Sequence, residues 1–175
     1  GVANSVQDIL DAAILLKEHK EIQFFLYGAG YQEEDLKKYK EEHHIDNVHF
    51  KGRVNKRFIP GILSRGNLNM LTGPSDRVSE YGMSMNKMFD YMMAAKPIIQ
   101  AIDAGNNLVR EADCGIDVEP DNVSEISKAI LALKSMSEEE RRKLGENGKK
   151  FVLSNHTYQV LGKRFLDIMN NLIEK

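Results

Sequence analysis

Residues 81–102 read YGMSMNKMFDYMMAAKPIIQAI, and this stretch decides the fold class. The second half of the segment from Met83 to Ala95 has the apolar spacing of a helix. Lys96-Pro97 ends that helix, because proline cannot continue it. The apolar run from Pro97 to Ile102 then predicts a buried strand. A helix that leads directly into such a strand is the building unit of a parallel sheet.

The same alternation of helix and strand continues on both sides of this unit. Further strands are expected over residues 22–27, 48–50, 68–71 and 115–118. Helices are expected over residues 4–18, 33–44, 56–64, 106–112, 122–133, 137–153 and 157–174. This order predicts an α/β fold, a Rossmann-like parallel sheet with helices on both faces and a helical C-terminal tail. This tail is longer than a doubly wound domain needs, so part of it is expected to pack against a partner that this sequence does not include.

Two features refine this prediction. Ser137 followed three residues later by Glu140 predicts a capping box at the start of a tail helix. The chain has 175 residues, which fits a single domain over residues 1–175 with a core of its own.

Composition excludes several classes of protein. The formal net charge is −2, so no broad basic field favours binding to nucleic acid. Cys114 is the one cysteine, which excludes an internal disulfide and zinc or iron–sulfur sites built on several cysteines. This usage indicates an intracellular, cytoplasmic protein. No histidine has a second ligand at metal spacing, so we expect no metal site.

Glycines follow the strand expected over residues 22–27. Gly28-Ala29-Gly30 resembles part of a dinucleotide fingerprint, but Glu33 stands at the third glycine position. The pair is either a simple turn between strand and helix or a place where the backbone closely approaches a phosphate or sugar. The sequence leaves both interpretations open.

The helix within residues 81–97 carries a more informative pattern. Gly82 and Ser84 are expected to open it, so free backbone N–H groups would face an anion. Lys87 adds a positive charge one turn in, and Asp90 lies on the same face three residues later. This combination suits a phosphate group beside a vicinal diol. The alternative is an ordinary surface Lys–Asp pair on an amphipathic helix.

A family resemblance rests on this stretch and on three others. Residues 84–97, S-M-N-K-M-F-D-Y-M-M-A-A-K-P, resemble the S-P-N-K-x-F-E-Y-M-A-A-G-K-P stretch of family 4 glycosyltransferases. These are retaining enzymes of the GT-B fold. The turn at residues 26–30, the segment 47–54 and the segment 112–115 agree in the same order. The nearest branch builds bacterial surface polysaccharides and includes fucosamine transferases.

The resemblance implies that the chain is the C-terminal, donor-binding half of a two-domain enzyme. The opening at Gly1, without Met, agrees with this expectation. The N-terminal acceptor domain would lie outside the sequence, as would the first strand of the C-terminal domain. The catalytic residues, which this sequence does not identify, are expected in the N-terminal domain. The expected partners are a nucleotide-sugar donor, with a UDP-sugar favoured, and a glycan or lipid-linked acceptor. No cofactor or metal is expected. Such an acceptor implies peripheral association with the inner face of the cytoplasmic membrane.

The resemblance also assigns candidate donor-binding residues. Asp90 stands at the second acid of the family's Glu-x7-Glu motif, which binds ribose hydroxyls. Gly82 occupies the place of the first acid, and Glu80 lies two residues too early to fill it. Met85 replaces the usual proline before Asn-Lys. The full candidate set is Asp90, Lys87, Gly82, Met83 and Ser84 for phosphate, sugar and ribose, Arg53 and Val54 near the base, Gly28 and Gly30 along the cleft, and Asn4 at the phosphates.

Two other functions compete with the transferase. A nucleotide-sugar epimerase half has the same architecture and would release free sugar without an acceptor. A non-catalytic α/β nucleotide-binding module is the second alternative. Glu33, together with the lack of an acidic residue at the end of the next strand, argues against dinucleotide binding in particular.

Overall fold

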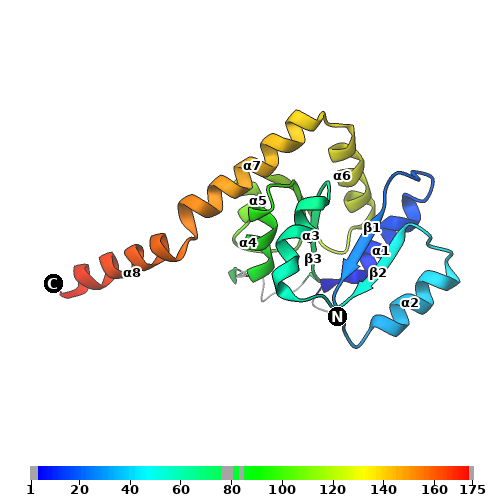
Figure 1. The fold of residues 1–175 in the computed structure, drawn as a ribbon, viewed down its shortest axis with the longest axis horizontal. Helices are drawn as coiled ribbons and strands as arrows, with labels where there is room; N and C mark the ends of the chain where they lie inside the picture. The colour runs from blue at the N-terminus through cyan, green and yellow to red at the C-terminus, as the bar shows by residue number, and fades with distance from the viewer. Residues whose placement is uncertain (1–3, 76–80, 83–84, 174–175) are drawn as a thin grey trace.

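The computed structural model describes residues 4–75, 81–82 and 85–173, and these residues alternate between strands and helices (Figure 1). All five expected strands are present, with ends within two residues of those expected. The strands are β1 (Phe24–Tyr27), β2 (Val48–Gly52), β3 (Asn69–Thr72), β4 (Ile98–Ala101) and β5 (Gly115–Val118). The helices are α1 (Val6–Leu15), α2 (Glu33–Glu42), η2 (Lys56–Phe58), α3 (Ile59–Arg65), α4 (Asn86–Met93), α5 (Leu108–Glu111), α6 (Val123–Ser135), α7 (Glu138–Asn155) and α8 (Tyr158–Ile173).

All strand pairs among the described residues are parallel, and the strands form two sheets. One sheet has the order β1-β2 and the other has the order β3-β4-β5. The prediction of an α/β fold with parallel strands is therefore confirmed. The two sheets are separate because β1 and β3 face each other across a cavity and do not hydrogen-bond to each other.

Strand β4 is the centre of the larger sheet, and all four of its residues are buried. Ile99 belongs to a core formed with α1 and α6, whereas Ile98 belongs to a second core formed with α4, α5 and α7. Adjacent residues of a strand point to opposite faces, so the two isoleucines mark two covered faces. The prediction of helices on both faces is confirmed, and a strand covered in this way is typical of parallel sheets.

Helix α1 connects the two sheets. Its buried residues pack against α6 and belong to the same core as Phe24 and Val48 of the smaller sheet. The Asn47 side-chain amide, just before β2, donates a buried hydrogen bond of 3.1 Å to the Ala13 carbonyl oxygen. The position of the smaller sheet relative to the larger one therefore depends on this helix.

Helix α4 begins later than expected. Gly82 and Ser84 were expected to open it, but the helix starts at Asn86, after an extended Met85 with φ −94° and ψ 112°. Gly82 has φ +104°, which is incompatible with a right-handed helix, so the chain turns there instead. At its other end the helix finishes at Met93, followed by Ala95 in the left-handed region with φ +53°.

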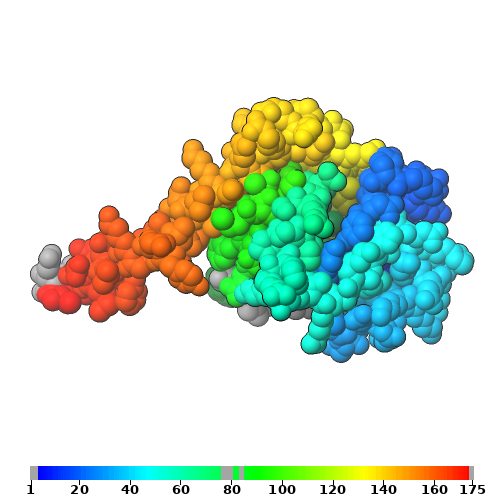
Figure 2. Space-filling model, viewed as in Figure 1, coloured from blue at the N-terminus to red at the C-terminus, as the bar shows by residue number. Residues whose placement is uncertain are grey.

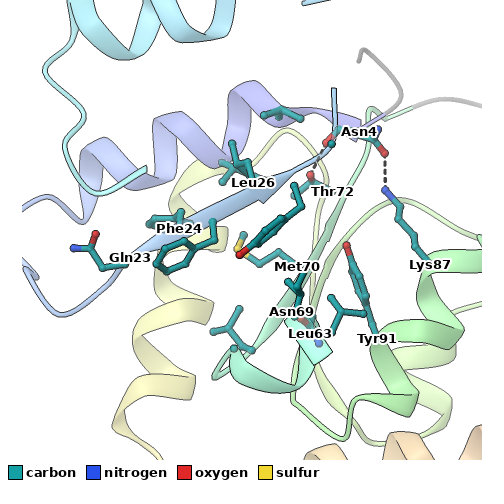
Figure 3. A pocket seen from close by; sticks show the side chains of 18 of the residues that line it. Asn4, Gln23, Phe24, Leu26, Leu63, Asn69, Met70, Thr72, Lys87 and Tyr91 are labelled. Atoms are coloured by element: carbon teal, nitrogen blue, oxygen red, sulfur yellow. Dashed lines mark hydrogen bonds between the residues drawn. The ribbon is translucent and has the colours of Figure 1, made fainter. Parts of the chain in front are cut away.

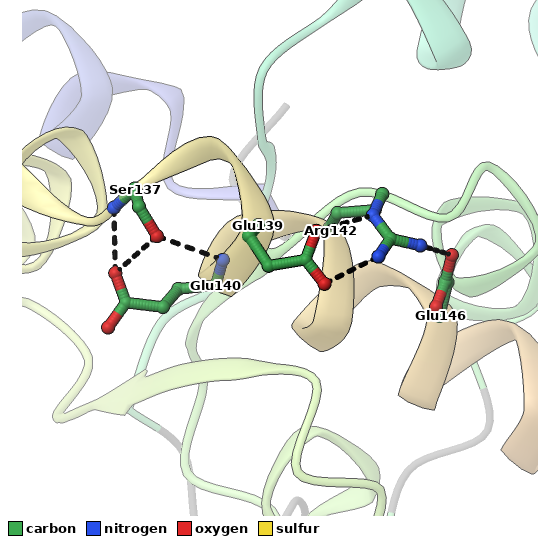
Figure 4. Close-up of polar contacts among 5 residues, drawn as sticks. All are labelled: Ser137, Glu139, Glu140, Arg142 and Glu146. Carbon is green, nitrogen blue, oxygen red and sulfur yellow. Dashed lines mark hydrogen bonds and ion pairs between the residues drawn. The ribbon is translucent and has the colours of Figure 1, made fainter.

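Helix α7 has a well-formed start (Figure 4). The Glu140 N–H donates to Ser137 Oγ at 3.2 Å, and the Ser137 N–H donates to Glu140 Oε2 at 2.7 Å. This confirms the predicted capping box. Arg142, one turn later, bridges Glu139 and Glu146 with two ion pairs of 2.5 Å. Farther along the helix, Gly145 lies directly on the backbone that follows α4.

Helix α8 projects from the body of the protein (Figures 1 and 2). None of its described residues is buried, so its apolar side chains are largely exposed. These are Leu161, Phe165, Leu166, Ile168, Met169, Leu172 and Ile173. Within the part of the chain that the structure describes, no helix is long and apolar enough to cross a membrane.

The contact at Gly145 predicts a sharp intolerance to a single methyl group. A Cβ built at Gly145 would lie 2.1 Å from the Ala95 carbonyl oxygen, which is backbone and cannot rotate away. We expect Gly145→Ala to destabilise the protein by about 2 kcal/mol or more in urea unfolding. Gly162→Ala is the matched control, because that helical glycine has nothing within 4 Å of its Cβ position. Equal stability of the two variants would contradict this packing.

The left-handed conformation of Ala95, after α4, predicts that a substitution there increases stability. Ala95 is held at φ +53°, where a Cβ is unfavourable, and the family pattern quoted above has glycine at this place. We expect Ala95→Gly to stabilise the protein by about 0.5–1 kcal/mol in urea unfolding. Ala94→Gly should instead destabilise it, since Ala94 has an ordinary right-handed φ of −70°. A loss of stability in Ala95→Gly would refute the explanation.

Candidate functional site

The starts of two helices meet at the carboxyl ends of the strands. Lys87, in the first turn of α4, donates a hydrogen bond of 2.5 Å from Nζ to Oδ1 of Asn4, just before α1 (Figure 3). Thr72, the last residue of β3, donates from Oγ1 to the Asn4 carbonyl oxygen at 2.6 Å. Unpaired N–H groups at helix starts carry partial positive charge, so this junction is suited to an anion.

Lys87 contributes a full positive charge to this junction. Its side chain is half-buried, and this burial lowers the pKa of its ammonium group below the usual value for lysine. The hydrogen-bond partner, Asn4 Oδ1, is neutral and compensates only part of the lost hydration. A bound anion would supply the compensating charge, so the site favours a negatively charged ligand.

Asp90 lies one turn along α4 from Lys87 and lines the same cavity. The two side chains therefore share a face, as their spacing predicted. Asp90 is exposed, which leaves its carboxylate available to hydroxyl donors. The neighbouring Tyr91 also lines the cavity, and burial, with a smaller contribution from the Asp90 charge, raises the pKa of its phenol.

The glycine turn after β1 forms another part of the cavity wall. Gly28 and Gly30 line the cavity, together with Asn4 and Lys87. Gly28 has φ +138° and its N–H donates to the Gly52 carbonyl oxygen at 2.8 Å, so the turn is fixed at the end of the smaller sheet. The cavity has a volume of about 1100 Å³, and most of its length extends away from this junction, between β1 and β3.

The structure brings five of the ten candidate residues into this cavity: Asn4, Gly28, Gly30, Lys87 and Asp90. Arg53 and Val54 follow β2 at the same edge of the molecule but do not line the cavity. Gly82 is exposed and does not line it either; a Cβ there would lie 3.2 Å from Asn106 Oδ1. Met83 and Ser84 lie outside the described residues, as does Glu80.

Sequence reasoning missed two residues of this site. Thr72 holds Asn4 in place, and Tyr91 forms part of the wall beside Asp90. Thr72 directly follows the strand expected over residues 68–71, so its position at a strand end was the available signal. Tyr91 carried no comparable signal, because it reads as one more apolar residue of an amphipathic helix. No group of three or more His, Cys, Asp or Glu side chains within the described ranges could hold a metal ion.

Comparison with known proteins assigns the family. Residues 4–151 match the family described as Glycosyl transferases group 1, which is most of the chain. The chain belongs to this family. No curated protein sequence matches it. The match includes Asn4, Lys87 and Asp90, so the junction described above lies within the family domain.

Solved structures agree on the fold, which is that of the C-terminal domain of GT-B glycosyltransferases. The C-terminal domain of the group 1 protein LpcC from Francisella tularensis has a TM-score of 0.72 at 17% identity, with 89% of this chain and 81% of that chain covered. TarM from S. aureus, solved with UDP, gives 0.78 at 16% identity, with coverages of 96% and 33%. Anabaena Alr3699/HepE, solved with UDP-glucose, gives 0.76 at 15% identity, with coverages of 98% and 46%. The chain thus spans less than half of these two longer proteins.

Proposed function

We propose that this chain is the donor-binding domain of a retaining glycosyltransferase and binds a nucleoside-diphosphate sugar. The observation that carries the proposal is the Lys87–Asn4 contact, which joins two helix starts at the carboxyl ends of the strands. Transfer of a sugar from such a donor leaves a diphosphate with growing negative charge. Preorganised N–H groups and an ammonium group stabilise such a charge without a metal ion.

Each residue of the junction has a role in this proposal. Lys87 and the free N–H groups at the start of α4 bind the diphosphate, and Asn4 orients the Lys87 side chain. Asp90 accepts hydrogen bonds from the two ribose hydroxyls. The Gly28 turn lets the backbone approach the sugar or phosphate closely. Gly82, Met83 and Ser84 are proposed as further contacts to the sugar and phosphate, and Arg53 and Val54 as contacts near the base.

A UDP-sugar is the favoured donor in this proposal. TarM was solved with UDP and Alr3699/HepE with UDP-glucose, and both share the fold of this chain. The resemblance of residues 84–97 supports a role in bacterial surface polysaccharide synthesis, in the branch that includes fucosamine transferases. The acceptor, a glycan or lipid-linked sugar, would bind to a second domain at the inner face of the membrane. The exposed apolar series of α8 suits packing against that domain.

Nucleotide binding to this chain tests the proposal. We expect UDP to bind, and Asp90→Asn and Lys87→Met each to weaken it about tenfold or more in calorimetric titration, because each removes a hydrogen bond to a charged group. Asp35→Asn and Lys128→Met are matched controls on the exposed surfaces of α2 and α6 and should bind UDP like the unmodified chain. Binding of NAD in preference to UDP, GDP and ADP would instead support the nucleotide-binding module.

Turnover separates the transferase from the epimerase. This domain is expected to transfer no sugar by itself, because the acceptor site is assigned to a second domain. Release of free sugar and nucleotide from a UDP-sugar by this chain, with no acceptor present, would favour the epimerase half. Sugar transfer to an acceptor by this chain alone would contradict the assignment of the acceptor site to a second domain.

The lowered pKa of Lys87 predicts a pH dependence. The ammonium form binds the diphosphate, and this form is lost at a lower pH than in an ordinary lysine. We therefore expect the affinity for UDP to fall as pH rises toward 10, whereas Lys87→Arg keeps its charge throughout and declines less. Titration of UDP itself affects both proteins equally, so the difference between the two profiles reports Lys87. Parallel profiles would show that Lys87 does not bind the phosphate as a cation.

A further inference from the structure

A nucleoside-diphosphate sugar is a linear ligand, and its proposed contacts give it one direction along α4. Asp90 is assigned to the ribose, and Lys87 is assigned to the diphosphate with the N–H groups at the start of the helix. Residues 86 and 90 are about 6 Å apart along the helix axis, at about 1.5 Å per residue. The ribose therefore lies one turn into α4 and the phosphates lie at its start. The sugar, attached to the far phosphate, continues beyond the start of the helix.

The polar side chain of Asn106 lies beside this end of α4. Asn106 belongs to the loop between β4 and α5, and it lies next to Gly82, which has no side chain of its own. A Cβ on Gly82 would lie 3.2 Å from Asn106 Oδ1 and 3.6 Å from its Cγ. Met85, the residue directly before α4, lines a small cavity of about 20 Å³ together with Asn106. Two independent observations thus place Asn106 next to the start of α4.

The backbone at Gly82 leaves this space to Asn106. Gly82 has φ +104°, a conformation that residues with a side chain rarely adopt. An acid at position 82, the place of the first acid in the Glu-x7-Glu motif, would be strained and would press against the Asn106 amide. The lack of this acid and the position of Asn106 therefore belong together. The chain presents a neutral amide from another loop where the motif has a carboxylate.

The chemistry of a carboxamide suits a sugar beside a diphosphate. The amide of Asn106 offers two N–H donors and a carbonyl acceptor, so it can pair with sugar hydroxyls in either sense. It carries no charge, so it does not repel the diphosphate as a carboxylate would. The neighbouring Asn107 has a different role, because its Oδ1 accepts the Arg110 N–H at 3.0 Å and caps α5. The two adjacent asparagines are therefore distinct in function.

We propose that Asn106 binds the sugar of the donor and helps to select it, through hydrogen bonds between its carboxamide and hydroxyl groups of the sugar ring. This inference rests on the proposed function, because the place of the sugar follows from the place of the diphosphate. It adds the loop between β4 and α5 to a site that is otherwise built from α1, β1 and α4. Asn106 is half-buried, so its carboxamide is held in place before the sugar arrives.

Paired calorimetric titrations test this inference. Each protein is titrated with UDP and with UDP-glucose, UDP-galactose, UDP-N-acetylglucosamine and UDP-N-acetylgalactosamine. The ratio of the Kd for a UDP-sugar to the Kd for UDP isolates the contribution of the sugar. We expect Asn106→Ala to raise this ratio about fivefold for the UDP-sugar that the unmodified chain binds best, because hydrogen bonds to uncharged hydroxyls are lost. Asn107→Ala is the matched control: it removes the cap of α5 in the same loop and should leave the ratio unchanged.

Nuclear magnetic resonance supplies a second measurement on the unmodified chain. The side-chain amide signals of Asn106, identified by their loss in Asn106→Ala, should shift further with that UDP-sugar than with UDP. An unchanged ratio in Asn106→Ala, or equal shifts with the two ligands, would overturn the inference, while binding of UDP would still support the proposed donor site. If the unmodified chain does not bind UDP, the proposed function fails, and the inference fails with it.

Discussion

The packing of α1 is the constraint on which the rest of the structure depends. Its buried face, Ile9, Leu10, Ala12 and Ala13, contacts α6 on one side and shares a core with the smaller sheet on the other. Tyr39 of α2 donates a hydrogen bond of 2.7 Å to Asp11 of α1, and Asn47 reaches the Ala13 carbonyl oxygen. Because the two sheets share no strand pairing in the described residues, these contacts determine how the sheets lie relative to each other. The same helix places Asn4 beside Thr72 and Lys87.

The site combines this placement with the packing of α4. Met88 and Met92 bury one side of that helix in the second core, which leaves Lys87 and Asp90 toward the cavity. Gly145 and Ala95 allow α7 to approach the end of α4 with backbone against backbone. The position of the Lys87 ammonium is therefore set by two packed interfaces rather than by a flexible surface loop. Preorganisation of this kind is what an anion site needs, because little ordering then remains for the ligand to drive.

Local patterns predicted most of the fold but only part of the site. The five strands, the capping box at Ser137 and the shared face of Lys87 and Asp90 all follow from short-range periodicity and spacing. The start of α4 was predicted too early, because a glycine with φ +104° reads from sequence as an acceptable helix residue. The Asn4–Thr72 contact joins residues 68 positions apart, and no local pattern encodes it. The separation into two sheets is likewise a tertiary feature that helix and strand alternation cannot reveal.

The cavity between β1 and β3 and the proposed donor site meet at one residue. Asn4 lines this cavity, accepts a hydrogen bond from the Thr72 hydroxyl through its carbonyl oxygen and accepts one from the Lys87 ammonium through its side-chain oxygen. Because one residue makes both contacts, its carbonyl and side-chain oxygens are fixed together, and with them the direction of the Lys87 Nζ–H bonds. The end of β3 and the anion site are thereby joined through a single residue, so a change at either hydrogen bond bears on the other.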